Sequence, residues 1–171
     1  MRFLFDENFP GNTIGPLQRL TKSRHVFLKP GRDYPTGISD VELFDTAASL
    51  GAEAVITADL LQIQGLDRKH ERAACRSAGL HWIGVPRHPQ ARGRRIAHLQ
   101  LAQLVAALEP MAAQISEATE PRAFLLTSGS LNAHFQDGYP QALETDGNPT
   151  CGVEHSVRAC MFTRGPPKAR R

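Results

Sequence analysis

Acidic residues recur in this chain at three places where an expected strand ends or an expected helix begins. They are Asp6, Glu7, Asp40, Glu42 and Asp59. The first pair and the last residue directly follow short apolar runs, which are typical of buried strands. Sites in open α/β sheets form outside the carboxyl ends of the strands, so we expect these carboxylates to lie at one edge of a sheet.

Carboxylates that converge from separate elements repel one another unless a cation joins them. Mg²⁺ and Mn²⁺ prefer such oxygen ligands and retain water molecules for a phosphate substrate. The pattern therefore predicts metal-assisted cleavage of phosphodiester bonds. Taken singly, each acid also has a structural interpretation: Asp6 can cap the next helix, Asp40 and Glu42 can interact with a helix dipole, and Asp59 can belong to a turn.

The elements that must position these acids alternate along the chain. Expected strands cover residues 1–5, 25–28, 54–57, 81–85 and 123–126, and expected helices cover 13–20, 39–50, 67 or 69 to 78, and 94–117. Ser39 and Glu42 have the spacing of a capping box, which marks the start of the second helix. Alternating strands and helices predict an α/β fold with a mostly parallel sheet that is covered on both faces.

The 171 residues are enough for one domain with a substantial core. We expect the domain to span residues 1–128, because residues 129–171 lose periodicity and predict an irregular or disordered tail. No apolar stretch is long enough for a membrane span, and the amino terminus does not resemble a signal peptide. Cys75, Cys151 and Cys160 suggest neither a disulfide framework nor a zinc site, so we expect a cytoplasmic protein.

Basic charge is concentrated in the second half of the chain. Lys/Arg and Asp/Glu balance over residues 1–86, so the net charge of +3 arises beyond them. Four arginines cluster there without a neighbouring acid, namely Arg87, Arg92, Arg94 and Arg95. Such a cluster can attract phosphates, which predicts nucleic-acid binding, although a solvated helix start is the competing interpretation.

Several short segments, in this order, resemble the PIN-like domain family, in particular the branch related to VapC-type toxin ribonucleases. They are FLFDEN at 3–8, HV at 25–26, ISDVEL at 38–43, VITAD at 55–59, HER at 70–72, the later helix and FL at 124–125. The resemblance covers about residues 1–128. It implies a three-layer α/β/α fold around a mostly parallel sheet and a Mg²⁺- or Mn²⁺-dependent endoribonuclease. It also implies RNA as substrate and an antitoxin protein as partner; a homodimer is a further expectation.

Carried over residue by residue, the resemblance assigns the first acid of the site to Asp6, the second to Asp40 or Glu42, and the third to Asp59. The expected metal ligands are Asp6, Asp40 and Asp59. Many relatives have a further Asp close to the third acid, where this chain has Leu60-Leu61-Gln62. Glu71 is the expected substitute, with Asp67 as its rival. This departure leaves open a second interpretation, a catalytically incomplete PIN-like binding module.

Two other α/β classes fit the residues poorly. A haloacid-dehalogenase-type phosphatase needs a second Asp two residues after Asp6, where this chain has Asn8. A receiver domain needs a Lys at the end of a late strand, but the only Lys after Lys69 is Lys168 in the tail. His81 begins an expected strand, so we interpret it as a structural residue.

Overall fold

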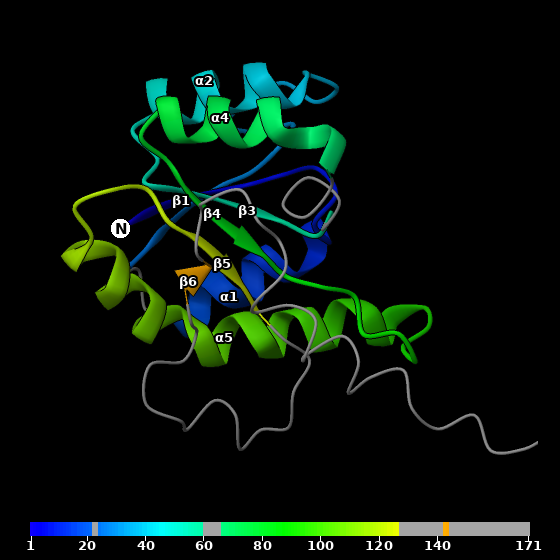
Figure 1. Cartoon of the computed structure of the whole chain (residues 1–171). Helices are drawn as coiled ribbons and strands as arrows, with labels where there is room; N and C mark the ends of the chain where they lie inside the picture. The colour runs from blue at the N-terminus through cyan, green and yellow to red at the C-terminus, as the bar shows by residue number, and fades with distance from the viewer. Residues whose placement is uncertain (22–23, 60–65, 127–141, 144–171) are drawn as a thin grey trace, which may run out of the picture.

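Short apolar segments form a twisted parallel sheet with one antiparallel edge (Figure 1). The computed structural model describes residues 1–21, 24–59, 66–126 and 142–143. The strands within this part are β1 (Arg2–Phe5), β2 (Val26–Leu28), β3 (Ala54–Thr57), β4 (His81–Gly84), β5 (Ala123–Leu125) and β6 (Ala142–Leu143). Their order in the sheet is β2-β1-β3-β4-β5-β6, and β6 alone is paired antiparallel.

Helices cover both faces of the sheet, which gives three layers (Figure 1). The helical elements are η1 (Gly11–Thr13), α1 (Ile14–Leu20), α2 (Asp40–Ser49), η2 (Leu66–Arg68), α4 (Lys69–Ser77) and α5 (Arg94–Glu117). Side chains of successive strand residues point to opposite faces. Phe3 and Phe5 therefore pack in the core beneath α1 and α5, whereas Leu4 packs in the core beneath α2 and α4.

The strand order reverses between β1 and β3. The chain passes from β1 to the sheet edge at β2 and then returns to place β3 on the other side of β1. Phe5 is in register with Ile56, and the N–H of Asp6 donates to the carbonyl oxygen of Ile56 at 2.9 Å. A reversal of this kind leaves a crevice outside the carboxyl ends of the two strands, which is where ligands bind in open α/β sheets.

The predicted α/β class and three-layer architecture are confirmed, and the five expected strands are present. The sequence did not predict β6, because its two residues carry no periodic signal and depend on the exposed edge of β5 for their pairing. The rest of the expected tail lies outside the described residues, so the domain boundary at 128 stays a prediction. None of the helices among the described residues has the length and apolar character needed to cross a membrane.

Candidate acidic site at the carboxyl edge of the sheet

Asp6 is held rigidly at the end of β1. Its side chain is buried although it is charged. Its Oδ2 accepts a hydrogen bond from the Thr57 hydroxyl at 2.8 Å and another from the Asn8 side-chain amide at 3.1 Å. These donors compensate for part of the solvation that burial removes. Asp6 is thus a carboxylate with a fixed orientation at the strand end, where the sequence predicted it.

Asp59 is tied to the same point through Thr57. The backbone N–H of Asp59 donates to Oγ1 of Thr57 at 3.0 Å, and that hydroxyl in turn donates to Asp6. Asp59 itself is half-buried. The structure therefore brings the first and third predicted acids to the adjacent ends of β1 and β3.

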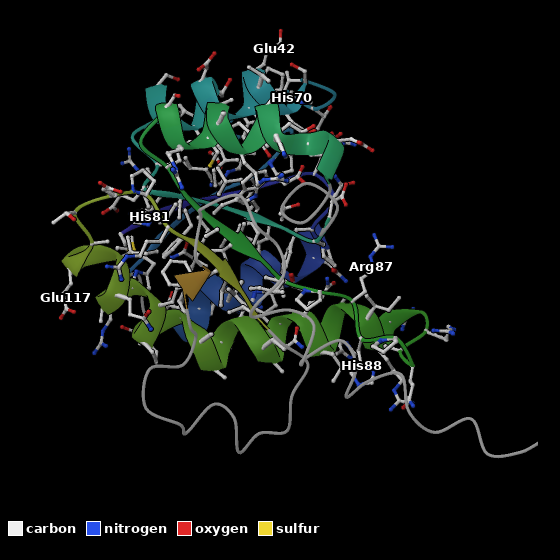
Figure 2. All side chains as sticks on the ribbon, viewed as in Figure 1. Glu42, His70, His81, Arg87, His88 and Glu117 are labelled. Carbon is white, nitrogen blue, oxygen red and sulfur yellow. The ribbon has the colours of Figure 1, made fainter. Side chains whose placement is uncertain are left out.

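The sequence predicts either Asp40 or Glu42 as the second acid, and the structure distinguishes the two. Asp40 is half-buried, and its pKa is raised by burial and then by the negative charges of Glu71 and Asp6. Glu42 is exposed and caps its own helix: its Oε2 accepts from the N–H and the hydroxyl of Ser39, both at 2.9 Å. These bonds lower the pKa of Glu42, and Figure 2 shows Glu42 at the outer side of the helix layer, away from the sheet.

Burial distinguishes Glu71 from the alternative residue, Asp67. Asp67 is exposed, whereas the Glu71 side chain is only 5% exposed in the first turn of α4. Oε1 of Glu71 accepts from Nη1 of Arg68 at 2.5 Å, and the same nitrogen donates to Oδ2 of Asp40 at 3.0 Å. The buried Oε2 of Glu71 has no hydrogen-bond partner within the described part of the chain. Glu71 therefore belongs to the group that includes Asp40.

A small hollow of about 30 Å³ opens between Asp6 and Asp40. This volume is enough for a water molecule or a small cation. Glu7, Asn8 and Tyr34 also line it. The Tyr34 hydroxyl donates to the carbonyl oxygen of Phe5, and its pKa is raised by burial and by the charges of Asp6 and Glu7. Tyr34 thus stays protonated and fixes the wall of the hollow.

Sequence reasoning missed four polar residues of this site, namely Asn8, Tyr34, Thr57 and Arg68. Two of them are close in sequence to the acid they contact: Asn8 follows Asp6 by two residues, and Arg68 precedes Glu71 by three. The roles of Tyr34 and Thr57 depend on contacts between segments that lie 29 and 51 residues apart. Such contacts leave no pattern in a single sequence.

The four arginines of the predicted nucleic-acid patch are all exposed. Arg87 follows β4, and Figure 2 shows it on the side of the molecule opposite His81, which begins that strand. Arg87 therefore lies toward the carboxyl end of β4. Part of the Arg92 guanidinium already makes hydrogen bonds within the protein, because its Nη1 donates to the carbonyl oxygens of Pro89 and Ala91, both at 2.8 Å.

The donor types in the acidic site suit a hard divalent cation, because they are carboxylate, amide and hydroxyl oxygens. The unpartnered oxygen of Glu71 is a further ligand atom of the right kind. The spacing is less favourable: across the described residues, no three His, Cys, Asp or Glu side chains lie close enough together to hold a metal ion. Arg68 stands between two of the acids instead.

Comparison with protein-family models gave one finding. The model described as PIN like domain matches residues 1–86, which is half of the chain. The matched segment runs from β1 to β4 and contains Asp6, Asp40, Asp59 and Glu71. Neither the curated proteins nor the solved structures gave a match.

Proposed function

The chain belongs to the PIN-like domain family, whose membership indicates a nuclease-type function, and on this premise we propose that it is an endoribonuclease that requires Mg²⁺ or Mn²⁺. The supporting observation is that acids from four elements lie in two linked pairs, Asp6 with Asp59 through Thr57 and Asp40 with Glu71 through Arg68. Asp6 follows β1, Asp59 follows β3, Asp40 begins α2 and Glu71 lies in the first turn of α4. Asp40 senses the charges of both Asp6 and Glu71, so these side chains form one electrostatic unit.

Asp6, Asp40 and Asp59 would hold the metal ion, with Glu71 as a further acid of the same site. When bound, the ion would supply an activated water and neutralise charge on the scissile phosphate. The chain itself contributes rigidity: Thr57 and Asn8 orient the carboxylate of Asp6, and Tyr34 closes the wall beside it. A carboxylate that is already oriented loses little freedom when it binds a cation or a water molecule.

The arginine patch supports RNA as the substrate. Arg87, Arg94 and Arg95 are exposed beyond the carboxyl end of β4 and before or within the first turn of α5. Guanidinium groups at such positions can contact phosphates without reading bases. We therefore assign this patch to substrate binding and the acids to the chemistry.

A cleavage assay tests the proposal. The full-length protein is incubated with a fluorescently labelled single-stranded RNA in the presence of Mn²⁺, Mg²⁺ or EDTA. We expect cleavage with either ion, none with EDTA, and a loss of at least about 100-fold in Asp6→Asn and Asp59→Asn. The matched control is Asp45→Asn, since Asp45 is an exposed acid on the same helix as Asp40. Equal cleavage by Asp6→Asn and the wild type would contradict the proposal.

A second candidate function is a catalytically incomplete binding module. The observation that favours it is the spacing of the acids, with an arginine between Asp40 and Glu71. Calorimetric titration with Mn²⁺ separates the two candidates: a module without a complete site binds RNA through its arginines but shows no saturable heat with the ion.

The cellular role that we propose is the toxin of a toxin–antitoxin pair. Induced expression should then arrest growth of a bacterial host, the Asp6→Asn variant should not, and a co-expressed antitoxin protein should relieve the arrest. We propose a cytoplasmic location, which suits the buried thiol of Cys75, whose pKa is raised to about 12 by burial. A homodimer is the further assembly to test, by light scattering.

A further inference from the structure

One nitrogen atom of Arg68 lies between two carboxylates. Its Nη1 donates to Oδ2 of Asp40 at 3.0 Å and to Oε1 of Glu71 at 2.5 Å. The two carboxylates come from different helices, α2 and α4. A single positive group at hydrogen-bond distance from both performs the task that a divalent ion performs between two carboxylates, which is to offset their mutual repulsion.

The positive charge of Arg68 offsets the cost of burying the carboxylate of Glu71. Its side chain is 5% exposed, and a buried carboxylate without a partner is costly. Arg68 satisfies Oε1, and His70 lies near the same oxygen at 3.6 Å, while the buried Oε2 has no hydrogen-bond partner among the described residues. One oxygen of Glu71 is therefore held by an arginine, and the other is a buried carboxylate oxygen, the atom type that Mg²⁺ and Mn²⁺ prefer as a ligand.

Arg68 itself is not locked into the core. Its side chain is 38% exposed, and it lies in the short η2 turn directly before α4. The long side chain can swing toward solvent without moving the helix that carries Glu71. The two partners thus differ: the carboxylate is fixed by burial, and the guanidinium can leave.

From these contacts we infer that Arg68 is an internal cation that competes with a divalent metal ion for Asp40 and Glu71. The arginine holds the two acids together when no metal ion is present. Binding of Mg²⁺ or Mn²⁺ displaces its guanidinium toward the solvent. Metal affinity is therefore set partly by the strength of an arginine–carboxylate contact within the chain. This inference rests on the proposed function, because it concerns the same site.

Calorimetric titration of the full-length protein with Mn²⁺ alone tests the competition. Arg68→Met keeps most of the aliphatic side chain and removes the charge, so it should bind Mn²⁺ roughly tenfold more tightly than the wild type. Arg68→Lys retains a positive charge and should stay closer to the wild type. The matched control is Arg76→Met, because Arg76 is an exposed arginine in the last turn of α4; this variant should not change the affinity. Unchanged or weaker binding in Arg68→Met would overturn the inference.

A measurement on the wild-type protein keeps the test independent of how the variant folds. Phenylglyoxal modifies guanidinium groups that are not held by carboxylates, and mass spectrometry reports each arginine separately. Saturating Mg²⁺ should accelerate modification of Arg68 and leave Arg76 unchanged. A rate at Arg68 that is unaffected or slowed by Mg²⁺ would show that the arginine is not displaced.

The outcomes distinguish this inference from the proposed function. If Arg68→Met binds Mn²⁺ more tightly but neither protein cleaves RNA, the competition stands and the ribonuclease proposal fails. If the wild type cleaves RNA with Mn²⁺ and Arg68→Met gains no affinity, the ribonuclease stands and the competition fails. If no protein in the set binds Mn²⁺, both fail.

Discussion

The hydroxyl of Thr57 donates a 2.8 Å hydrogen bond to Oδ2 of Asp6, across 51 residues of sequence. Both side chains are buried. The same hydroxyl oxygen accepts the N–H of Asp59, so one side chain contacts residues that follow both strands. A single hydroxyl therefore orders the ends of β1 and β3, where two of the predicted acids lie.

Thr57→Val should lower the free energy of unfolding by about 2 kcal/mol, because it removes a hydrogen bond to a buried charged group while preserving shape. Urea denaturation measures this change. Thr57→Ser keeps the hydroxyl and serves as the control, with a smaller loss that reflects one missing methyl group. A valine variant as stable as the wild type would mean that the hydrogen bond contributes nothing to folding.

Asp40→Asn should leave the metal-free protein equally stable or make it more stable at neutral pH. Burial and the charges of Glu71 and Asp6 raise the folded pKa of Asp40 above its ordinary value of 3.8. When the folded pKa of a carboxyl group is raised, the folded protein becomes more stable as the pH falls through that pKa. The charged form of Asp40 is therefore unfavourable for folding at pH 7. Melting temperatures in EDTA test this expectation, and a clear drop would show that the ion pair with Arg68 dominates.

Glu42→Gln should lower the stability of the protein, in contrast to Asp40→Asn. The hydrogen bonds from Ser39 lower the folded pKa of Glu42, so its charged form stabilises the capping box. That contribution is present above the unfolded pKa of about 4.5 and is lost as the pH falls through the lower folded pKa. We expect a lower melting temperature for Glu42→Gln at pH 7, a smaller difference at pH 3, and no change in Mn²⁺ affinity.

His81 should make the protein sensitive to mild acid. Its Nδ1 accepts the N–H of Arg122 at 3.1 Å, and burial lowers its folded pKa below the ordinary 6.5. Because the unfolded chain takes up this proton more readily, stability is full above pH 6.5 and falls as the pH drops toward the folded pKa. Melts between pH 7.5 and 5 should show a smaller acid-induced drop for His81→Gln than for the wild type. His98→Gln, at an exposed position, should follow the wild type.

Arg87→Gln combined with Arg95→Gln should weaken RNA binding and flatten its salt dependence. Loss of two phosphate contacts should reduce the slope of log affinity against log salt by about 1.4 for a single strand. Fluorescence anisotropy at several salt concentrations measures both quantities. Arg76→Gln with Arg122→Gln is the control, since it removes the same charge from other exposed positions. Equal slopes for the two double variants would leave the patch as a solvated surface.

The strands could be predicted because each is an apolar run with turn residues after it, and this also located Asp6 and Asp59. The choice between Asp40 and Glu42 could not be predicted, because both residues lie in one helical turn. Which of them faces the sheet depends on how α2 is rotated by the packing of Leu43 and Phe44. Arg68 escaped prediction for a similar reason: its contact with Asp40 spans 28 residues and requires α4 to lie beside α2.

The apolar layer between α2, α4 and the sheet sets the separation between two kinds of acid. Asp6 and Asp59 are carried by strand ends, whereas Asp40 and Glu71 are carried by helices. Phe44 meets Trp82 edge-on between these layers, with ring centroids 5.1 Å apart and planes at 72°. This pair acts as a spacer, and close-packed interiors transmit a change in one side chain to the elements around it. Phe44→Leu would make this apolar layer thinner and move Asp40 and Glu71 relative to Asp6 and Asp59. The distance across the acidic site therefore depends on packing in the hydrophobic core.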